Sequence, residues 1–267
     1  MVSGRRSRYE AKDWICPKCK KEYKPIKCSL IDVPQLECPI CNTQNETNFN
    51  FNIMKLHKNR ISLRTRVYNQ GTTGLCALYA SKTQAEIKCR VEGASGCWFH
   101  DRTIDEEEML EMYEREVGKS FGEEDASEQG EVRVKRMLHT LQKGVKFKNS
   151  RTNKVVKIKE FWRTSKKDFS KICQLLGNGE PLVTYFRAGH NFDELPGNKI
   201  YKPPKLDKGD AGIAHAVCLV GAGAHGEGEC YQRYLWFRNS YGMVFVLKGD
   251  GMVPFSDILI DPFGVTL

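Results

Sequence analysis

The chain has 267 residues, of which 40% are apolar and 28% charged, and its formal net charge is +9. This length and apolar content allow one substantial domain and a small additional module. No stretch is long and apolar enough to span a membrane, and the basic, polar start lacks the apolar segment of a secretory signal. The sequence therefore predicts a soluble protein with no membrane partner.

Two matched cysteine pairs come first in the chain. The sequence reads CPKC at residues 16–19 and CPIC at residues 38–41. Each CxxC pair lets two thiolates converge on one tetrahedral ion, and two pairs complete its coordination. A redox dithiol is the alternative, but two matched pairs in a short basic segment without a βαβ pattern favour zinc. We therefore predict one structural zinc ion bound by Cys16, Cys19, Cys38 and Cys41, in a segment that folds only with its metal.

Most of the positive charge lies in the same region. Residues 1–66 contain 14 Lys or Arg and 6 Asp or Glu, so +8 of the formal +9 lies there. Basic zinc ribbons bind nucleic acid through salt-dependent phosphate contacts, and they also bind proteins. A solvated basic tail is the plainer interpretation. The asparagine-rich residues 42–52 read as a linker or last ribbon strand, so we predict a basic zinc-ribbon module at 1–52 and a second domain at 53–267.

The segment around Cys76 has the features of a nucleophile site. Residues 69–76 read NQGTTGLC, a glycine-bearing turn with Gln70 placed six residues ahead of the cysteine. Small and apolar residues follow and predict a helix. The positive end of the helix dipole and its free N–H groups would lower the pKa of a thiol at the first turn. Cys76 is therefore a candidate thiolate, which a nearby imidazolium would stabilise further.

The middle of the chain is predicted to be helical first and β-rich later. An amphipathic helix begins within residues 103–110, where a capping residue and an acidic first turn precede apolar residues. A second helix is expected at 131–143, strands within 144–165, a helix at 166–176 and a central strand at 181–186. This layout is typical of an α+β fold with the site in the cleft between the two halves.

Two short apolar strands near the end each carry one polar residue. Residues 213–223 read IAHAVCLVGAG, with His215 near the start, and residues 234–240 read YLWFRNS, with Asn239 near the end. His215 and Asn239 follow Cys76 by 139 and 163 residues. Taken separately, each of the three residues has a plain structural interpretation: Cys76 as a buried cysteine, His215 as a structural histidine and Asn239 as a turn residue. Together they suggest a thiol, an acid–base group and a residue that orients it.

These motifs resemble those of papain-like cysteine peptidases. NQGTTGLCALYA is similar to the family's NQGxCGSCWAFS, IAHAVCLVGAG to its DHAVxxVGYG, and RNSYG to its KNSWG. Between them, PLVTYFRAGHNFDELPGNKIYKPP resembles the family's stretch that runs into a loop of the form FxxYxxGIYxxP. The order and separation of Cys, His and Asn also fit. The resemblance covers residues 60–267 and implies the two-lobed papain fold, with a helical lobe and a β-barrel-like lobe.

The resemblance implies a role for each candidate. Cys76 would be the nucleophile, and His215 would stabilise its thiolate and protonate the leaving amine. Asn239 would orient the imidazole. Gln70 would donate its side-chain N–H to the oxyanion together with the backbone N–H of Cys76. This chemistry needs no cofactor.

Other positions match the family less closely. Gly130, in the sequence SEQG, resembles one glycine of the loop that pairs with the substrate backbone. Tyr241 stands where the family has the tryptophan that shields the His–Asn contact, and it lies beside the substrate cleft. Ala77 replaces the tryptophan that follows the nucleophile, which would loosen a packing contact and weaken activity.

The stretch before Gln70 is too short for the family's helical propeptide. The family's disulfide cysteines are missing, so we expect a reducing compartment, the cytoplasm or nucleus.

The main hypothesis is an intracellular papain-like cysteine endopeptidase that acts on peptide or protein substrates. Its zinc ribbon would recruit it to nucleic acid or to a protein partner. The first alternative is a binding protein that retains the papain fold without full catalysis and acts through its ribbon. The second is a different acyl transfer at the same residues, such as cleavage of an isopeptide bond or transfer to an amine.

Overall fold

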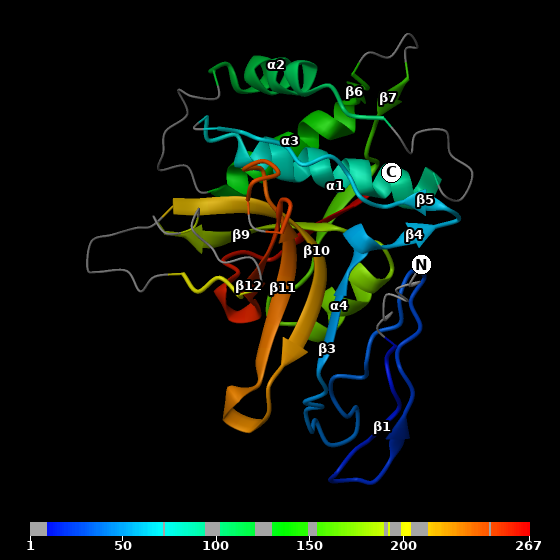
Figure 1. The fold of residues 1–267 in the computed structure, drawn as a ribbon. Helices are drawn as coiled ribbons and strands as arrows, with labels where there is room; N and C mark the ends of the chain where they lie inside the picture. The colour runs from blue at the N-terminus through cyan, green and yellow to red at the C-terminus, as the bar shows by residue number, and fades with distance from the viewer. Residues whose placement is uncertain are drawn as a thin grey trace, which may run out of the picture.

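The computed structural model describes residues 10–71, 73–93, 102–120, 130–148, 154–189, 192, 199–203, 213–245 and 247–267. A helical layer lies against one side of a twisted antiparallel sheet, and the N-terminal module lies at the opposite end of the molecule (Figure 1). The helices are α1 (Cys76–Gly93), α2 (Glu106–Val117), α3 (Gly130–Lys143) and α4 (Phe169–Gly177). The strands are β1 (Trp14–Ile15), β2 (Glu22–Tyr23), β3 (Phe49–Asn52), β4 (His57–Lys58), β5 (Ile61–Ser62), β6 (Val145–Lys146), β7 (Val155–Val156), β8 (Glu160–Arg163), β9 (Leu182–Ala188), β10 (Ile213–His225), β11 (Gln232–Arg238), β12 (Asp250–Pro254) and β13 (Phe263–Thr266).

The long strand β10 organises the main sheet, whose order is β12-β11-β10-β9-β13-β8. One edge of β10 pairs with β11, whereas the other pairs first with β9 and then with β3. At the crossing with β3, a Cβ atom on Gly221 would lie 2.2 Å from the carbonyl oxygen of Phe51. Only glycine therefore allows the two backbones to approach so closely.

Two apolar cores cover the two faces of this sheet. Because successive strand residues point to opposite faces, neighbours in β9 and β10 divide between the cores. Val183 and Ala216 face α1, α2 and α3, whereas Leu182 and Val217 face α4 and the N-terminal module. The predicted α+β arrangement, helical first and β-rich later, is confirmed.

Helix α1 passes through the interior and is buried along most of its length, including its polar side chains. Lys82 Nζ lies 2.7 Å from Glu106 Oε2 on α2. Gln84 Nε2 donates hydrogen bonds to the carbonyl oxygens of Pro181 and Phe263, at 2.9 and 2.6 Å. These contacts compensate for the burial of Lys82 Nζ and Gln84 Nε2, and they tie the helix that begins at Cys76 to both the helical layer and the sheet.

Helix starts follow local capping. α2 begins after Asp105, whose side chain accepts hydrogen bonds from the amides of Glu107 and Glu108. It ends at Val117 and is followed by Gly118, whose φ is 73°. α4 begins at Phe169, three residues later than the sequence suggested, because the Asp168 side chain caps it. Among the described residues, no helix is both long and apolar enough to cross a lipid bilayer.

The N-terminal module packs directly on the sheet domain. Residues 49–52, expected to be linker or ribbon strand, form β3 and pair with β10. The backbone amides of Leu30 and Ile31 donate to the carbonyl oxygen of Gly177 at the end of α4. Ser29 contacts Asn178 through two hydrogen bonds of 2.9 and 2.7 Å. The division of the chain at residue 52 stays a prediction, but the two parts share backbone pairing.

Candidate functional site

Cys76 is the first residue of α1, as predicted, and its side chain is half-buried. Its sulfur contacts the backbone amide of Ala216, the residue that follows His215 in β10. The start of α1 and the start of β10 therefore meet at this point. This juxtaposition brings together residues far apart in the sequence, which the motif order anticipated.

The second contact of the site joins His215 to Asn239. His215 Nε2 lies 2.7 Å from Asn239 Oδ1, and both residues are buried. The amide of Ser240 also donates to this oxygen, at 2.9 Å, which identifies it as the acceptor. His215 therefore donates from Nε2, and its other ring nitrogen, Nδ1, is left to accept a proton.

Aromatic rings enclose the imidazole. The ring centre of Tyr241 lies 5.0 Å from that of His215, and those of Phe192 and Phe186 lie 5.3 and 5.9 Å away. Tyr241 thus packs on His215, as expected of a residue that shields the contact with Asn239. Sequence reasoning missed Phe192 and Phe186, although both lie in the stretch that resembles the family's central strand and loop.

Burial sets the protonation of this pair. It lowers the pKa of His215 to about 4, although the hydrogen bond to Asn239 opposes this shift. Burial also raises the pKa of the Cys76 thiol, while the amides of Ala216 and Ala77 and the positive charge of Arg133 act in the opposite direction. Each shift favours the uncharged form of its group. The thiolate that the sequence suggested stays a prediction, and burial opposes it.

Gln70 is held beside the site by the segment that carries Asn239. Its backbone amide donates to the carbonyl oxygen of Ser240 at 2.7 Å, and its side-chain oxygen contacts the Ser240 hydroxyl. With the amide oxygen engaged, the side-chain nitrogen is the donor that remains for a substrate oxyanion. Asn69 and Tyr241 form an adjacent β-bridge, so the two segments run side by side.

Gly130 is the first residue of α3 and lies against the ring of Tyr185. A Cβ atom at this position would be 2.5 Å from Tyr185 Cε1, so close packing alone requires glycine. Tyr185 is the cross-strand partner of Ala216. Gly130 therefore lies near the start of β10, while its contact with substrate stays a prediction. The preceding residues 127–129 lie outside the described chain.

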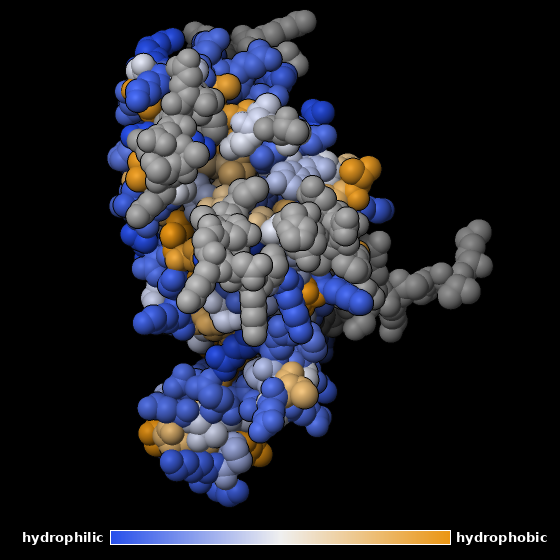
Figure 2. Space-filling view, turned by 90° about the vertical axis from the view of Figure 1, so that its left-hand side faces the viewer, coloured by the Kyte–Doolittle hydropathy of each residue, from blue (hydrophilic) through white to orange (hydrophobic). Residues whose placement is uncertain are grey.

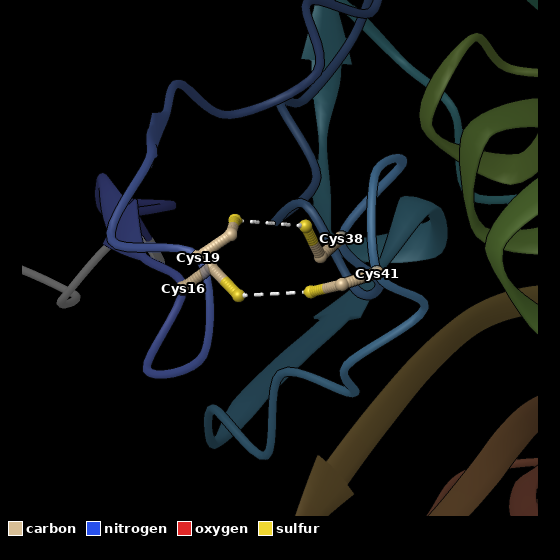
Figure 3. Close-up of side chains that lie close together, drawn as sticks. All are labelled: Cys16, Cys19, Cys38 and Cys41. Carbon is tan, nitrogen blue, oxygen red and sulfur yellow. Dashed lines mark hydrogen bonds between the residues drawn. The ribbon is translucent and has the colours of Figure 1, made fainter.

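The four predicted metal ligands converge at the other end of the molecule. The Sγ atoms of Cys16, Cys19, Cys38 and Cys41 all lie within 4.8 Å of one another (Figure 3). Cys16 faces Cys41 and Cys19 faces Cys38, each pair at 3.5 Å. A tetrahedral zinc ion with Zn–S bonds of about 2.3 Å needs sulfur atoms roughly 3.8 Å apart. The donor set and its spacing are therefore compatible with zinc.

The two cysteine loops share one backbone conformation. The amides of Lys20 and Asn42 donate to the carbonyl oxygens of Cys16 and Cys38, each at 2.9 Å. Lys20 and Asn42 also have positive φ angles, 59° and 56°, which are unusual for residues other than glycine. This repeated turn directs both sulfurs of each loop toward the same point. The cysteines that the structure describes form no disulfide bond with one another.

The lowered pKa of His215 predicts an acid-sensitive contribution to stability. An unfolded histidine titrates near 6.5, so between pH 6.5 and 4 the unfolded state binds more protons at this residue than the native state. His215 should therefore contribute stability that is fully present above pH 6.5 and lost as the pH falls to about 4. This change corresponds to about 3 kcal/mol in the free energy of unfolding.

Urea unfolding of the parent and of His215→Gln at pH 4, 5, 6 and 7 measures this contribution as a difference. Titration of all other groups is common to both proteins and cancels. A flat difference would contradict the prediction. A parent that gains stability relative to the variant as the pH falls would indicate an imidazolium paired with a thiolate.

Comparisons with known proteins agree with this geometry. The sequence model of the papain family cysteine proteases matches residues 65–250, which excludes the four-cysteine segment. A digestive procathepsin L2 proteinase from the larval midgut of Tenebrio molitor has a similar structure, with a TM-score of 0.58 and 16% identity over 82% of this chain and 68% of that one. Xylellain, a cysteine protease from Xylella fastidiosa, gives a TM-score of 0.55 and 16% identity over 76% and 82%.

A cysteine protease of Carica candamarcensis, solved in complex with E-64, gives a TM-score of 0.54 and 20% identity over 76% of this chain and 92% of that one. None of the curated proteins matches this chain. These structural matches show a shared fold, and the family model covers more than half of the sequence. The chain therefore belongs to the papain family of cysteine proteases, a family of cysteine-type peptidases.

Proposed function

We propose that this peptidase is an endopeptidase that uses Cys76 as nucleophile and His215 as acid–base group, with Asn239 orienting the imidazole. The observation that carries the proposal is the hydrogen bond of 2.7 Å between His215 Nε2 and Asn239 Oδ1, beside a thiol that contacts Ala216. Gln70 and the amide of Cys76 would stabilise the oxyanion.

The protonation of the site indicates how the thiol is activated. Burial favours the uncharged form of both groups, so in this proposal the Cys76 proton passes to His215 Nδ1 as sulfur attacks the peptide carbonyl. The imidazolium then protonates the leaving amine, and the peptide bond breaks to give a thioester. His215 next removes a proton from water, which hydrolyses the thioester and restores the thiol.

We further propose that the four-cysteine cluster holds one structural zinc ion and that its module recruits the enzyme to nucleic acid or to a protein. Four sulfur ligands leave no open coordination position, so the metal would take no part in peptide cleavage. β3, the last strand of the module, pairs with the end of β10 away from His215. Ala224, which pairs with Phe49 of β3, lies nine residues beyond His215. This corresponds to roughly 30 Å along an extended strand, so the module lies well away from the proposed active site.

The surface of this module suits a recruiting role. The end of the molecule that carries the module is largely hydrophilic, with a few apolar groups (Figure 2). Ile15 and Ile40 next to the metal-binding loops are 62% and 56% exposed. A partner bound there would leave the active site accessible. The described cysteines form no disulfide, and together with the cysteine-rich metal site this supports a reducing compartment, the cytoplasm or the nucleus.

One observation favours a second candidate function, a binding protein with weak catalysis. Burial favours the uncharged forms of Cys76 and His215, and a neutral thiol is less reactive than a thiolate. In that case the module alone would carry the biological effect.

Labelling by an epoxysuccinyl inhibitor of the E-64 type separates these functions. We expect the reduced protein to gain one adduct by intact mass, located on Cys76 by peptide mapping. Cys76→Ser should gain none, and His215→Ala should react far more slowly. No adduct on a folded parent would support the binding protein.

A second experiment identifies the reaction. Mass spectrometry of the products from a peptide substrate distinguishes hydrolysis from transfer to an amine. A substrate with an isopeptide linkage tests whether that bond is cleaved.

A further inference from the structure

A buried ion pair lies directly behind the proposed active site. Arg238, the residue before Asn239, has its Nε 2.6 Å from Asp250 Oδ1. Both side chains are almost fully enclosed, with 1% and 9% of their surface exposed. The two residues are also cross-strand partners, at the last position of β11 and the first of β12. The pair therefore fixes the place where the chain leaves the sheet and enters the segment that carries Asn239.

The same pair reaches two further segments. Arg238 Nη1 donates to the carbonyl oxygen of Thr65 at 3.2 Å, in the stretch that leads to Gln70. Asn52 Nδ2 donates to the second carboxylate oxygen of Asp250 at 3.3 Å, from the last residue of β3. Segments that hold Asn239 and Gln70 are thus anchored to one charged centre.

Stability alone does not account for this pair. A buried ion pair loses the solvation of both charges, and replacing both partners with apolar residues of similar volume is often neutral or stabilising. Here Arg238 Nη2 has no hydrogen-bond partner within the described part of the chain, so the desolvation is incompletely compensated. What the pair supplies, and apolar residues cannot, is directional contact with three separate segments.

We propose that Arg238 and Asp250 are positioning residues of the peptidase, an inference that rests on the proposed role of Asn239 and Gln70. The pair holds the end of β11 so that Asn239 Oδ1 meets His215 Nε2. Through Thr65, it also holds the segment of Gln70 in register with Ser240. Neither residue touches the substrate, so their effect on catalysis passes through these neighbours.

The decisive variant removes both charges at once, Arg238→Met with Asp250→Leu, which leaves no unpaired charge in the interior. We expect this protein to fold, with kcat reduced by about 10-fold to 100-fold and KM changed by less than about twofold. The matched control is Lys88→Met with Glu180→Gln, since this partly buried ion pair of 2.7 Å lies away from the site. The control should keep the kcat of the parent.

Proton NMR gives a readout that a purely structural role would not change. The hydrogen-bonded Nε2 proton of His215, identified by its loss in His215→Gln, should be present in the parent and the control and lost in the double variant. A folded double variant with unchanged kcat and unchanged His215 signal would overturn the proposal.

Two further outcomes remain decisive. If the double variant does not fold, Arg238→Lys is measured instead, because it keeps the charge but loses the contact with Thr65. We then expect a smaller loss of kcat and a shifted His215 signal, and no change in either would overturn the proposal. A last case is a parent that is inactive but shows the His215 signal, with loss of this signal in the double variant. The proposed catalytic role of Cys76 and His215 then fails, while the positioning role of Arg238 and Asp250 is supported.

Discussion

Replacing Cys76 with alanine is expected to lower kcat/KM for peptide hydrolysis by roughly 10⁴-fold or more, because no other group on the described chain lies where it could form the thioester. The structure supports this by placing Cys76 at the start of α1, against the strand that carries His215. The measurement is the release of a fluorescent group from a peptide substrate under reducing conditions.

The exposed Cys230 provides a matched control. Cys230→Ala removes a thiol as well, but at an exposed position in the turn between β10 and β11, so it should retain the activity of the parent. Equal activity of the parent and Cys76→Ala would exclude Cys76 as the nucleophile. A biological effect that survives this substitution would favour the binding protein.

Replacing Cys19 and Cys38 with serine is expected to remove about one zinc ion per chain and to unfold the N-terminal module. Two ligands from different loops are lost, and small metal sites of this kind are unstable without their ion. We also expect a lower melting temperature for the remaining protein, because Leu30 and Ile31 bond to the end of α4 and β3 pairs with β10. Metal content by mass spectrometry and thermal unfolding by circular dichroism measure the two effects.

Cys230→Ser serves as the control here and should keep both the metal and the melting temperature. Protein purified without chelators that contains no zinc would refute the metal site. Loss of zinc with an unchanged melting temperature would show that the module unfolds independently of the peptidase domain.

Local sequence was sufficient for features that depend on short spacing. Two CxxC motifs identified the four cysteines that converge, since the turn within each motif needs only a few consecutive residues. The acidic start of α2 followed from a capping residue, observed as Asp105. The start of α4 was misplaced, because Ser165 to Asp168 forms a turn whose capping role depends on the side chain of Asp168.

The candidate site was anticipated as a set of residues, through their resemblance to family motifs, but its chemistry was not. The motifs gave Cys76, His215 and Asn239 in order. They did not show that burial would raise the pKa of Cys76 and lower that of His215, because this depends on how completely the surrounding rings and strands exclude water. Phe192 illustrates the same limit, since its packing on His215 follows from the fold of a distant loop.

The sequence by itself determined the four cysteines that converge, the helix that begins at Cys76 and the family of the chain, because each rests on residues close together or on recognisable motifs. Only the tertiary structure decided that residues 49–52 join the main sheet and that Asp250 receives a hydrogen bond from Asn52, 198 residues away. Such contacts depend on the register of β10 with β3 and β11. That register is set by the burial of both sheet faces together, which no single strand sequence reveals.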